Sequence, residues 1–203
     1  VRALGETEQV PKIMRHFNWN SDKTLTQVVD ILRQVYSQRL KAYRVEQTFA
    51  TDKTLANFFY LGFLLTAFPN ATVIEVTRAP KASGLSMYER LFNEGQCEFS
   101  YSLDELESYF QFYREVMVFW KSVFPNHIKS IRYEEFIEEQ EQQTWGLLDH
   151  IGLPHERQCL DFSGQERSVR TASFLQVRAP LYKSSSDAWR GIEGYVIAVE
   201  NKF

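Results

Sequence analysis

The sequence has 203 residues, a length that suits one α/β domain and needs no disulfide bonds for stability. Hydrophobic residues make up 44% and charged residues 24%, which is the balance of a globular chain and excludes an intrinsically disordered one. The net charge of −3 argues against a general nucleic-acid binder or a binder of anionic membranes, because both use a basic surface. A small anionic ligand still fits this charge, since it needs only a local cluster of positive side chains.

The cysteines and histidines show no spacing typical of a metal site or a redox motif. Cys97 and Cys159 lie far apart, which favours reduced thiols in a cytosolic protein over a disulfide bond. The turn at 152–154 favours surface-loop positions for His150 and His155 over metal ligation. The sequence has no signal peptide and no apolar run long enough to cross a bilayer. We therefore expect a cytoplasmic protein without a metal, and a homo-oligomer is compatible with the sequence.

The first half of the chain predicts two helices, a short strand and a third helix. A helix is expected from near Val10-Pro11, with the proline in its first turn. Ser21-Asp22 can cap the next helix, whose apolar residues recur at helical spacing: Leu25, Val28, Val29, Leu32, Val35 and Tyr36. Residues 47–51 are expected to form a short strand that ends at Asp52-Lys53, and a helix over 55–68 follows.

The next part of the chain begins with a clear strand. Residues 71–77 are rich in β-branched side chains and lead through Arg78-Ala79-Pro80 into a predicted helix over 81–92. Ser102-x-x-Glu105 matches a capping box at the start of a long amphipathic helix. The apolar stripe of that helix recurs at helical spacing: Leu103, Leu106, Phe110, Tyr113, Met117, Trp120 and Phe124.

A strand over 128–133 and a helix over 134–150 complete the pattern. Such alternation of strands and helices predicts an α/β fold with a parallel sheet and helices on its faces. Ligands collect at the carboxyl ends of parallel strands, and Lys53, Arg78 and Tyr133 all fall at strand ends.

Arg78, Ser86 and Arg90 form a candidate anion site. Arg78 ends a strand, and Ser86 and Arg90 are expected one and two turns into the following helix, on one face of it. A phosphate requires charge-assisted donors, which arginine and a hydroxyl supply. Taken singly, each arginine could instead pair with Glu89 or Glu94 at the surface, but the set after a strand favours an anion site.

The segment Val76-Thr77-Arg78-Ala79-Pro80 with Ser86 and Tyr88 resembles the 3′-phosphate-binding segment of sulfotransferases. The likeness continues through further stretches: Thr51-Asp52-Lys53 with Asn57-Phe58, Phe68-Pro69-Asn70-Ala71, Ile131-Arg132-Tyr133-Glu134, and Val169 to Ser173 running on to Tyr182, Ser185 and Trp189. The likeness covers nearly the whole chain. In the order and spacing of these stretches, the sequence resembles bacterial members of the family that are related to protein-tyrosine sulfotransferases. The resemblance implies one domain over 1–203, a P-loop-like three-layer fold with a central parallel sheet flanked by helices, and 3′-phosphoadenosine 5′-phosphosulfate (PAPS) as co-substrate.

The resemblance also implies three catalytic residues. Glu6 matches the general base that takes the proton of the acceptor hydroxyl. Lys53 matches a lysine that contacts the sulfonate and its bridging oxygen, where negative charge develops, and Ser173 matches a serine that orients the donor. Without the resemblance, the simpler interpretations are a glutamate at a helix N-terminus, a solvated loop lysine and a turn serine.

The nucleotide-binding residues follow from the same likeness. Arg78, Ser86 and Arg90 are implied to hold the 3′-phosphate, and Tyr133 the adenosine, although Tyr133 could equally close the core. No metal is expected, because lysine and arginine supply the charge that Mg²⁺ provides in phosphoryl transfer. The implied acceptor is a small-molecule or peptide hydroxyl, such as an alcohol, a sugar or a tyrosine, and not a nucleic acid.

Two departures from the family pattern matter. The sequence contains no Pro-Arg-Ser-Gly-Thr loop, which would cradle the 5′-phosphate and the sulfonate, so the first strand and loop of the fold are expected to be absent. Because the chain begins at Val1 rather than Met, we expect a fragment or a processed form. Ala188 stands before Trp189, where related tyrosine-sulfating enzymes have a lysine, and residues 182–189 are either a mobile lid or a connecting loop.

Two other functions are compatible with the same fold class. One is a non-catalytic nucleotide-binding or scaffold protein that has lost the donor loop. The other is a P-loop kinase, which would require a Gly-rich loop ending in Lys-Ser/Thr and an acidic Mg²⁺ ligand, and neither is visible in the sequence.

Overall fold

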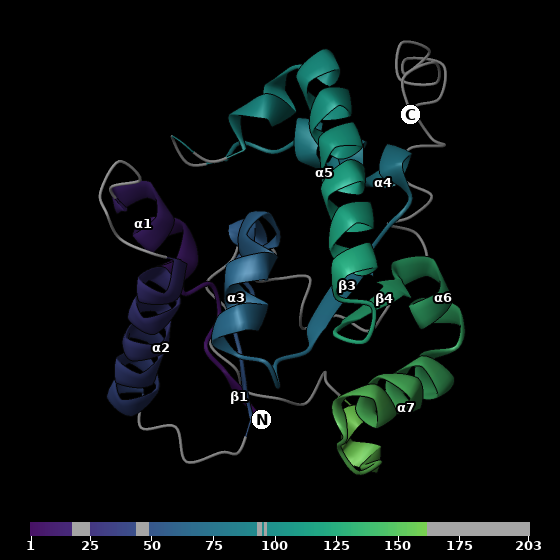
Figure 1. Cartoon of the computed structure of the whole chain (residues 1–203). Helices are drawn as coiled ribbons and strands as arrows, with labels where there is room; N and C mark the ends of the chain where they lie inside the picture. Colours follow the sequence, from purple (N-terminus) through teal and green to yellow (C-terminus); the bar gives the residue numbers. More distant parts are fainter. Residues whose placement is uncertain (18–24, 44–48, 93–94, 96, 162–203) are drawn as a thin grey trace, which may run out of the picture. The chain divides into compact units, whose positions relative to one another are not determined.

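The computed structural model describes residues 1–17, 25–43, 49–92, 95 and 97–161 (Figure 1). The chain divides into two compact units, which are described separately. The first unit comprises Val1–Ala71 and Ser122–His127, and the second comprises Thr72–Lys121 and the part of the chain from Ile128 onward. The single domain expected over 1–203 stays a prediction.

The first unit contains one short parallel sheet and a group of helices. Its elements are β1 (Arg2–Ala3), α1 (Gln9–His16), α2 (Leu25–Ala42), β2 (Ala50–Thr51), the 3₁₀ helix η1 (Leu55–Tyr60) and α3 (Leu61–Ala67). β1 pairs with β2 in parallel, with Arg2 opposite Ala50. β1 was missed from the sequence, because a strand of two residues is too short for any periodicity and is defined only by its partner.

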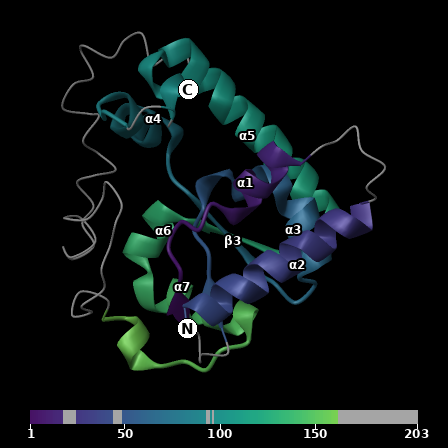
Figure 2. The same cartoon turned by 90° about the vertical axis from the view of Figure 1, so that its left-hand side faces the viewer.

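The core of the first unit forms where α1, α2 and α3 pack side by side (Figures 1 and 2). The buried residues come from all three helices: Val10, Met14, Val28, Val29, Leu32, Tyr36 and Ala67. The predicted stripe of α2 is confirmed at four of its six positions, whereas Leu25 at the start of the helix is 62% exposed. The proposed cap at 21–22 lies outside the described residues.

The single helix predicted over 55–68 is instead a 3₁₀ helix followed by an α-helix. A 3₁₀ helix has three residues per turn, so residues three apart lie on one side of it. Phe58 and Leu61 are three apart and both buried, while Leu55 is 70% exposed. The three-residue spacing is compatible with the joint burial of Phe58 and Leu61, but it does not extend to Leu55 at the start of the 3₁₀ helix.

The second unit contains the other parallel sheet. Its elements are β3 (Val73–Thr77), α4 (Pro80–Tyr88), η2 (Glu98–Tyr101), α5 (Leu103–Val123, up to Lys121 in this unit), β4 (Ile128–Arg132), α6 (Tyr133–Glu138), α7 (Gln140–Ile151) and η3 (Arg157–Cys159). β3 and β4 pair in parallel from Val73 opposite Ile128 to Thr77 opposite Arg132. α6 follows β4 directly and lies next to α7 (Figure 1).

Two predicted helices of the second unit have different bounds in the structure. The helix expected over 81–92 ends at Tyr88. The helix expected over 134–150 is two helices that meet at Glu139, whose φ of −125° and ψ of 46° are not helical. The break falls in a run of glutamate and glutamine, 138–143, that offers no apolar side chain to pack and places like charges close together.

All paired strands in the described part of the chain are parallel, as predicted, and they form two sheets of two strands. The parallel α/β character is therefore confirmed, while the three-layer arrangement around one central sheet stays a prediction. None of the described helices combines the length and the apolar content that a membrane span requires.

A buried carboxylate links β3, β4 and α5. Glu75, at the middle of β3, is 6% exposed and accepts hydrogen bonds from Ser130 Oγ and from Tyr113 Oη at 3.0 Å. Its Oε2 lies 2.6 Å from Lys121 Nζ. Burial alone would raise the pKa of the Glu75 carboxyl, but the hydrogen bonds from Lys121, Ser130 and Tyr113 outweigh burial and hold this pKa below its ordinary value.

Removing the lysine should destabilise the protein. In Lys121→Met the buried carboxylate of Glu75 loses its counter-charge, and we expect the free energy of unfolding to fall by about 1–2 kcal/mol at pH 7. This is less than for a fully buried pair, because the Lys121 side chain is 41% exposed. Because the pKa of Glu75 is lowered in the folded state, its stabilising contribution is present above pH 4.5 and is lost as the pH falls below that value.

Urea unfolding at pH 7 and at pH 3.5 measures both effects. Glu75→Gln should show a smaller loss of stability between the two pH values than the unsubstituted protein, because glutamine does not titrate. The exposed Glu89 offers a matched control, and Glu89→Gln should keep the original pH dependence. Equal pH dependence in Glu75→Gln and Glu89→Gln would show that Glu75 is not the group responsible.

Candidate functional site

In the first unit, two of the predicted catalytic side chains form an ion pair. Glu6 follows β1 and Lys53 follows β2, and the Lys53 ammonium group donates to Glu6 Oε1. Backbone hydrogen bonds extend the pairing beyond both strands, from Leu4 N to Thr51 O at 2.9 Å and from Lys53 N to Gly5 O at 2.8 Å. The parallel pairing therefore brings the carboxylate and the ammonium group together beyond the carboxyl ends of the strands, where parallel sheets bind ligands.

The ion pair is accessible to solvent. The Glu6 side chain is 34% exposed and the Lys53 side chain 60% exposed. An exposed pair contributes little to stability, because water screens the attraction. The position of these groups therefore depends on the backbone that carries them, and that backbone includes a left-handed residue at Gly5, with a φ of 74° that favours glycine.

A half-buried aspartate, Asp52, lies directly before Lys53 and receives hydrogen bonds from the segments that follow both strands. Asp52 Oδ2 accepts from Thr7 Oγ1 at 2.5 Å and from Tyr36 Oη at 2.7 Å. Asp52 Oδ1 accepts from Thr54 N at 3.0 Å and from Thr54 Oγ1 at 2.7 Å. Burial would raise the pKa of Asp52, but the hydrogen bonds from Thr7, Tyr36 and Thr54 outweigh it and hold the pKa below its ordinary value.

Sequence reasoning missed this network. The one visible signal was an aspartate flanked by threonines in the segment Thr51-Asp52-Lys53-Thr54 at a predicted strand end. The partner hydroxyl of Thr7 is 45 residues away in the sequence, so only the folded chain identifies it.

In the second unit, two of the predicted nucleotide-binding residues lie together. Arg78 follows β3 and Tyr133 follows β4, and the guanidinium carbon of Arg78 is 5.6 Å from the centre of the Tyr133 ring. The pairing of β3 with β4 brings these strand ends together. The neighbouring backbone amide of Ala79, at the start of α4, donates to Glu134 Oε1 at 2.9 Å. An anion bound here would therefore be held by side chains and not by that amide.

The other predicted site residues have a mixed outcome. Ser86 lies in the last turn of α4 and is half-buried. Arg90 lies beyond the end of the helix at Tyr88, so the prediction that Ser86 and Arg90 share a helix face is wrong. The backbone amide of Arg90 donates to Met87 O at 3.1 Å in the turn that follows the helix. Ser173 and the segment 182–189 lie outside the described residues.

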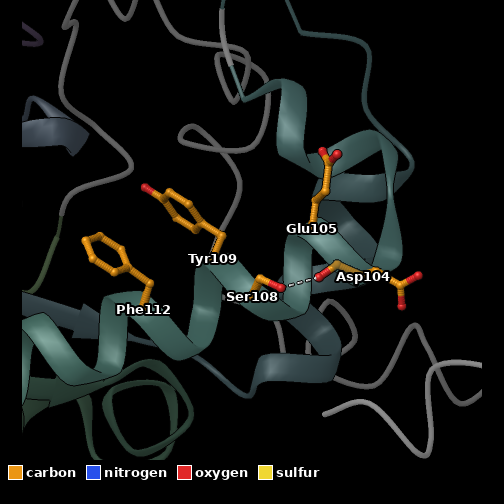
Figure 3. Close-up of a pocket in the computed structure, with 5 residues that line it drawn as sticks. All are labelled: Asp104, Glu105, Ser108, Tyr109 and Phe112. Carbon is orange, nitrogen blue, oxygen red and sulfur yellow. Dashed lines mark hydrogen bonds between the residues drawn. The ribbon is translucent and has the colours of Figure 1, made fainter.

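A hollow of about 380 Å³ lies along α5 and includes none of the predicted site residues (Figure 3). Its lining residues all belong to this helix: Asp104, Glu105, Ser108, Tyr109 and Phe112. Because one helix supplies the whole lining, polar groups do not converge on a ligand from several elements, as they do in binding sites. Within the described part of the chain, no group of three or more histidine, cysteine, aspartate or glutamate side chains could hold a metal ion.

A parallel α/β chain that carries lysine and arginine just after its strands belongs to the class of proteins suited to anionic ligands. The model of the sulfotransferase family matches residues 2–157, which include every predicted site residue except Ser173. The chain belongs to the sulfotransferase family. The resemblance inferred from the sequence is thus confirmed at the level of the family.

The chain is also similar to an uncharacterized protein of Aquifex aeolicus (strain VF5), with 33% identity over 168 residues. The alignment covers 82% of this chain and 22% of that protein. The chain therefore spans less than a quarter of the length of this relative.

Proposed function

We propose that the complete gene product transfers a sulfonate from PAPS to an acceptor hydroxyl. Membership of the family implies sulfonyl transfer in general terms. The observation that supports this particular reaction is the Glu6–Lys53 ion pair, which holds a carboxylate and an ammonium group together just after two parallel strands. One group can take a proton and the other can stabilise negative charge, and sulfonate transfer to a hydroxyl requires both.

In the proposed reaction the acceptor oxygen attacks the sulfur, and Glu6 takes the proton of the acceptor hydroxyl. The bond between sulfur and the bridging oxygen breaks, and its electron pair stays on that oxygen of the 5′-phosphate. Lys53 stabilises the negative charge that develops there. The products are a sulfate ester and 3′-phosphoadenosine 5′-phosphate (PAP), and Glu6, which is partly exposed, then releases its proton to solvent.

The donor-binding residues are proposed from their chemistry. The Arg78 guanidinium suits the 3′-phosphate, and the Tyr133 ring beside it suits the adenosine. Ser86 and Arg90 are proposed to assist at the 3′-phosphate, and Ser173 at the transferring sulfonate. Because the 203 residues contain no Pro-Arg-Ser-Gly-Thr loop for the 5′-phosphosulfate, activity is proposed for the complete gene product.

An activity screen with ³⁵S-labelled PAPS tests the proposal. The complete gene product would be incubated with pools of alcohols, sugars and tyrosine peptides, and label that moves to an acceptor supports sulfonate transfer. PAP binding without transfer to any pool would favour the non-catalytic nucleotide-binding alternative. Binding of ATP with Mg²⁺ in preference to PAP would favour a kinase, and either result would overturn the proposal.

Removing the guanidinium of Arg78 should weaken nucleotide binding. A hydrogen-bonded charge pair contributes about 1.5–3 kcal/mol, so Arg78→Ala is expected to raise the Kd for PAP by about 10- to 100-fold. Isothermal titration calorimetry of the complete gene product measures this change. AMP, which lacks the 3′-phosphate, is the matched control ligand, and its Kd should change less than about threefold. An equal loss of affinity for PAP and AMP would show that Arg78 does not contact the 3′-phosphate.

A further inference from the structure

We propose that Asp52 is a positioning residue, which holds the Glu6 segment against the Lys53 segment so that the two side chains act together. This inference rests on the proposed function for its catalytic consequence, and on the hydrogen bonds of the first unit for its structural part. Asp52 lies next to Lys53 in the chain, and its bonding partner Thr7 lies next to Glu6. Two hydrogen bonds, from the hydroxyl and the backbone amide of Thr7, therefore join the two residues that adjoin the proposed base and the proposed cation.

The Glu6–Lys53 pair does not hold itself in place. Both of its side chains are partly exposed, so their mutual attraction is screened by water. β1 and β2 are strands of only two residues each, which gives the parallel ladder little strength. Backbone hydrogen bonds extend this pairing to Gly5 and Lys53, and the side chain of Asp52 adds a further link between the two segments.

That link is rich in donors, and two of the residues that supply them are buried. Thr7 is 2% exposed and Thr54 is 6% exposed, and both hydroxyl groups donate to the Asp52 carboxylate. Thr54 also binds the Glu6 segment directly, because its Oγ1 accepts from Glu8 N at 2.9 Å. Hydrogen bonds to an ionised carboxylate are stronger than neutral ones, and burial strengthens them further.

Asp52 is also fixed from the helical side. Tyr36, on the buried face of α2, donates its hydroxyl to the same oxygen that receives Thr7. The carboxylate is therefore anchored to the core of the first unit, and Thr7 in turn anchors the Glu6 segment to the carboxylate. Five donors bind the Asp52 carboxylate, and all of them belong to Thr7, Tyr36 and Thr54. The network therefore leaves the side chains of Glu6 and Lys53 available.

Thr7→Val and Thr7→Ser separate positioning from packing. Valine keeps the shape of threonine but removes the hydroxyl that binds Asp52, whereas serine keeps the hydroxyl. Val28→Ala, a core substitution in α2, serves as the control for loss of stability, since Val28 is 1% exposed and has no part in the hydrogen-bond network. The melting temperature of each variant shows whether Thr7→Val and Val28→Ala are comparably destabilised.

Two measurements then decide the proposal. A zero-length carbodiimide cross-link between Glu6 and Lys53, quantified by peptide mass spectrometry, reports their contact without any catalysis. We expect Thr7→Val to lower the cross-link yield at least about threefold. It should also lower kcat for PAPS about tenfold or more, with little change in KM, because a misplacement of about 1 Å can cost up to about 100-fold in rate. Thr7→Ser and Val28→Ala should stay within about twofold of the unsubstituted protein in both measurements.

An unchanged cross-link yield in Thr7→Val, or an equal loss in Val28→Ala, would overturn the positioning role. A lowered cross-link yield with an unchanged kcat would show that the Thr7–Asp52 link is structural only, and this result would also overturn the positioning role. If the unsubstituted gene product transfers no sulfonate although the cross-link yields follow the expected pattern, the proposed function fails while the structural role of Asp52 stands.

Discussion

In the complete gene product, Glu6→Gln is expected to lower kcat for sulfonate transfer by about 10²- to 10⁴-fold, the range that general base catalysis supplies. Glutamine keeps the size of glutamate and still accepts a hydrogen bond from Lys53, but it cannot take the proton of the acceptor hydroxyl. The Kd for PAP should change less than about threefold, because Glu6 is assigned to the acceptor and not to the nucleotide. Steady-state kinetics with labelled PAPS and calorimetry with PAP measure the two quantities.

The same loop offers a matched control in Glu8. Glu8 lies two residues after Glu6 in the chain. Its carboxylate forms an ion pair with Arg15, whose Nη2 is 4.0 Å away. Glu8→Gln should leave kcat within about twofold of the unsubstituted protein. A normal rate in Glu6→Gln, or an equal loss in Glu8→Gln, would remove the assignment of Glu6 as the base.

Lys53→Met should lower kcat by about 10²- to 10³-fold, the loss expected when a group that stabilises developing charge is removed. Methionine keeps most of the length of the side chain and removes the ammonium group. Both nucleotides carry the oxygen that Lys53 is proposed to contact, which bridges to sulfur in PAPS and remains as a 5′-phosphate oxygen in PAP. We therefore expect the Kd for PAPS and the Kd for PAP both to rise, as measured by calorimetry.

Lys12→Met is the control for this prediction, because Lys12 is an exposed lysine on α1 of the same unit. Its kcat should stay within about twofold of the unsubstituted protein. Lys53→Arg retains a positive charge and should recover part of the lost rate. If Lys53→Met left the Kd for PAP, the Kd for PAPS and kcat unchanged, Lys53 would not be a contact of the bridging oxygen.

The elements with a strong periodic pattern could be predicted from the sequence. The buried face of α2 followed from the spacing of its apolar residues, and β3 followed from its β-branched residues. The meeting of Arg78 with Tyr133 could also be anticipated, because parallel pairing places the ends of β3 and β4 side by side. The assignment of Glu6 and Lys53 came from the resemblance, and their contact in the structure agrees with roles at one site.

What the sequence did not predict depends on local geometry or on distant partners. β1 exists only through its pairing with β2, and no spacing of apolar residues marks the change from the 3₁₀ helix η1 to α3. The end of α4 at Tyr88 moved Arg90 out of the helix, which no composition rule indicates. The Asp52 network required the position of a hydroxyl group 45 residues away.

The ion pair between Glu6 and Lys53 also affects how an anionic donor would reach the protein. The two opposite charges cancel, so at distances beyond about 8 Å in physiological salt the pair exerts almost no pull on a nucleotide. Long-range electrostatic steering must then come from other cations, such as Arg78. In the proposed reaction, the association rate of the donor should therefore depend on ionic strength through the arginines, and Lys53 should act only after the donor has arrived.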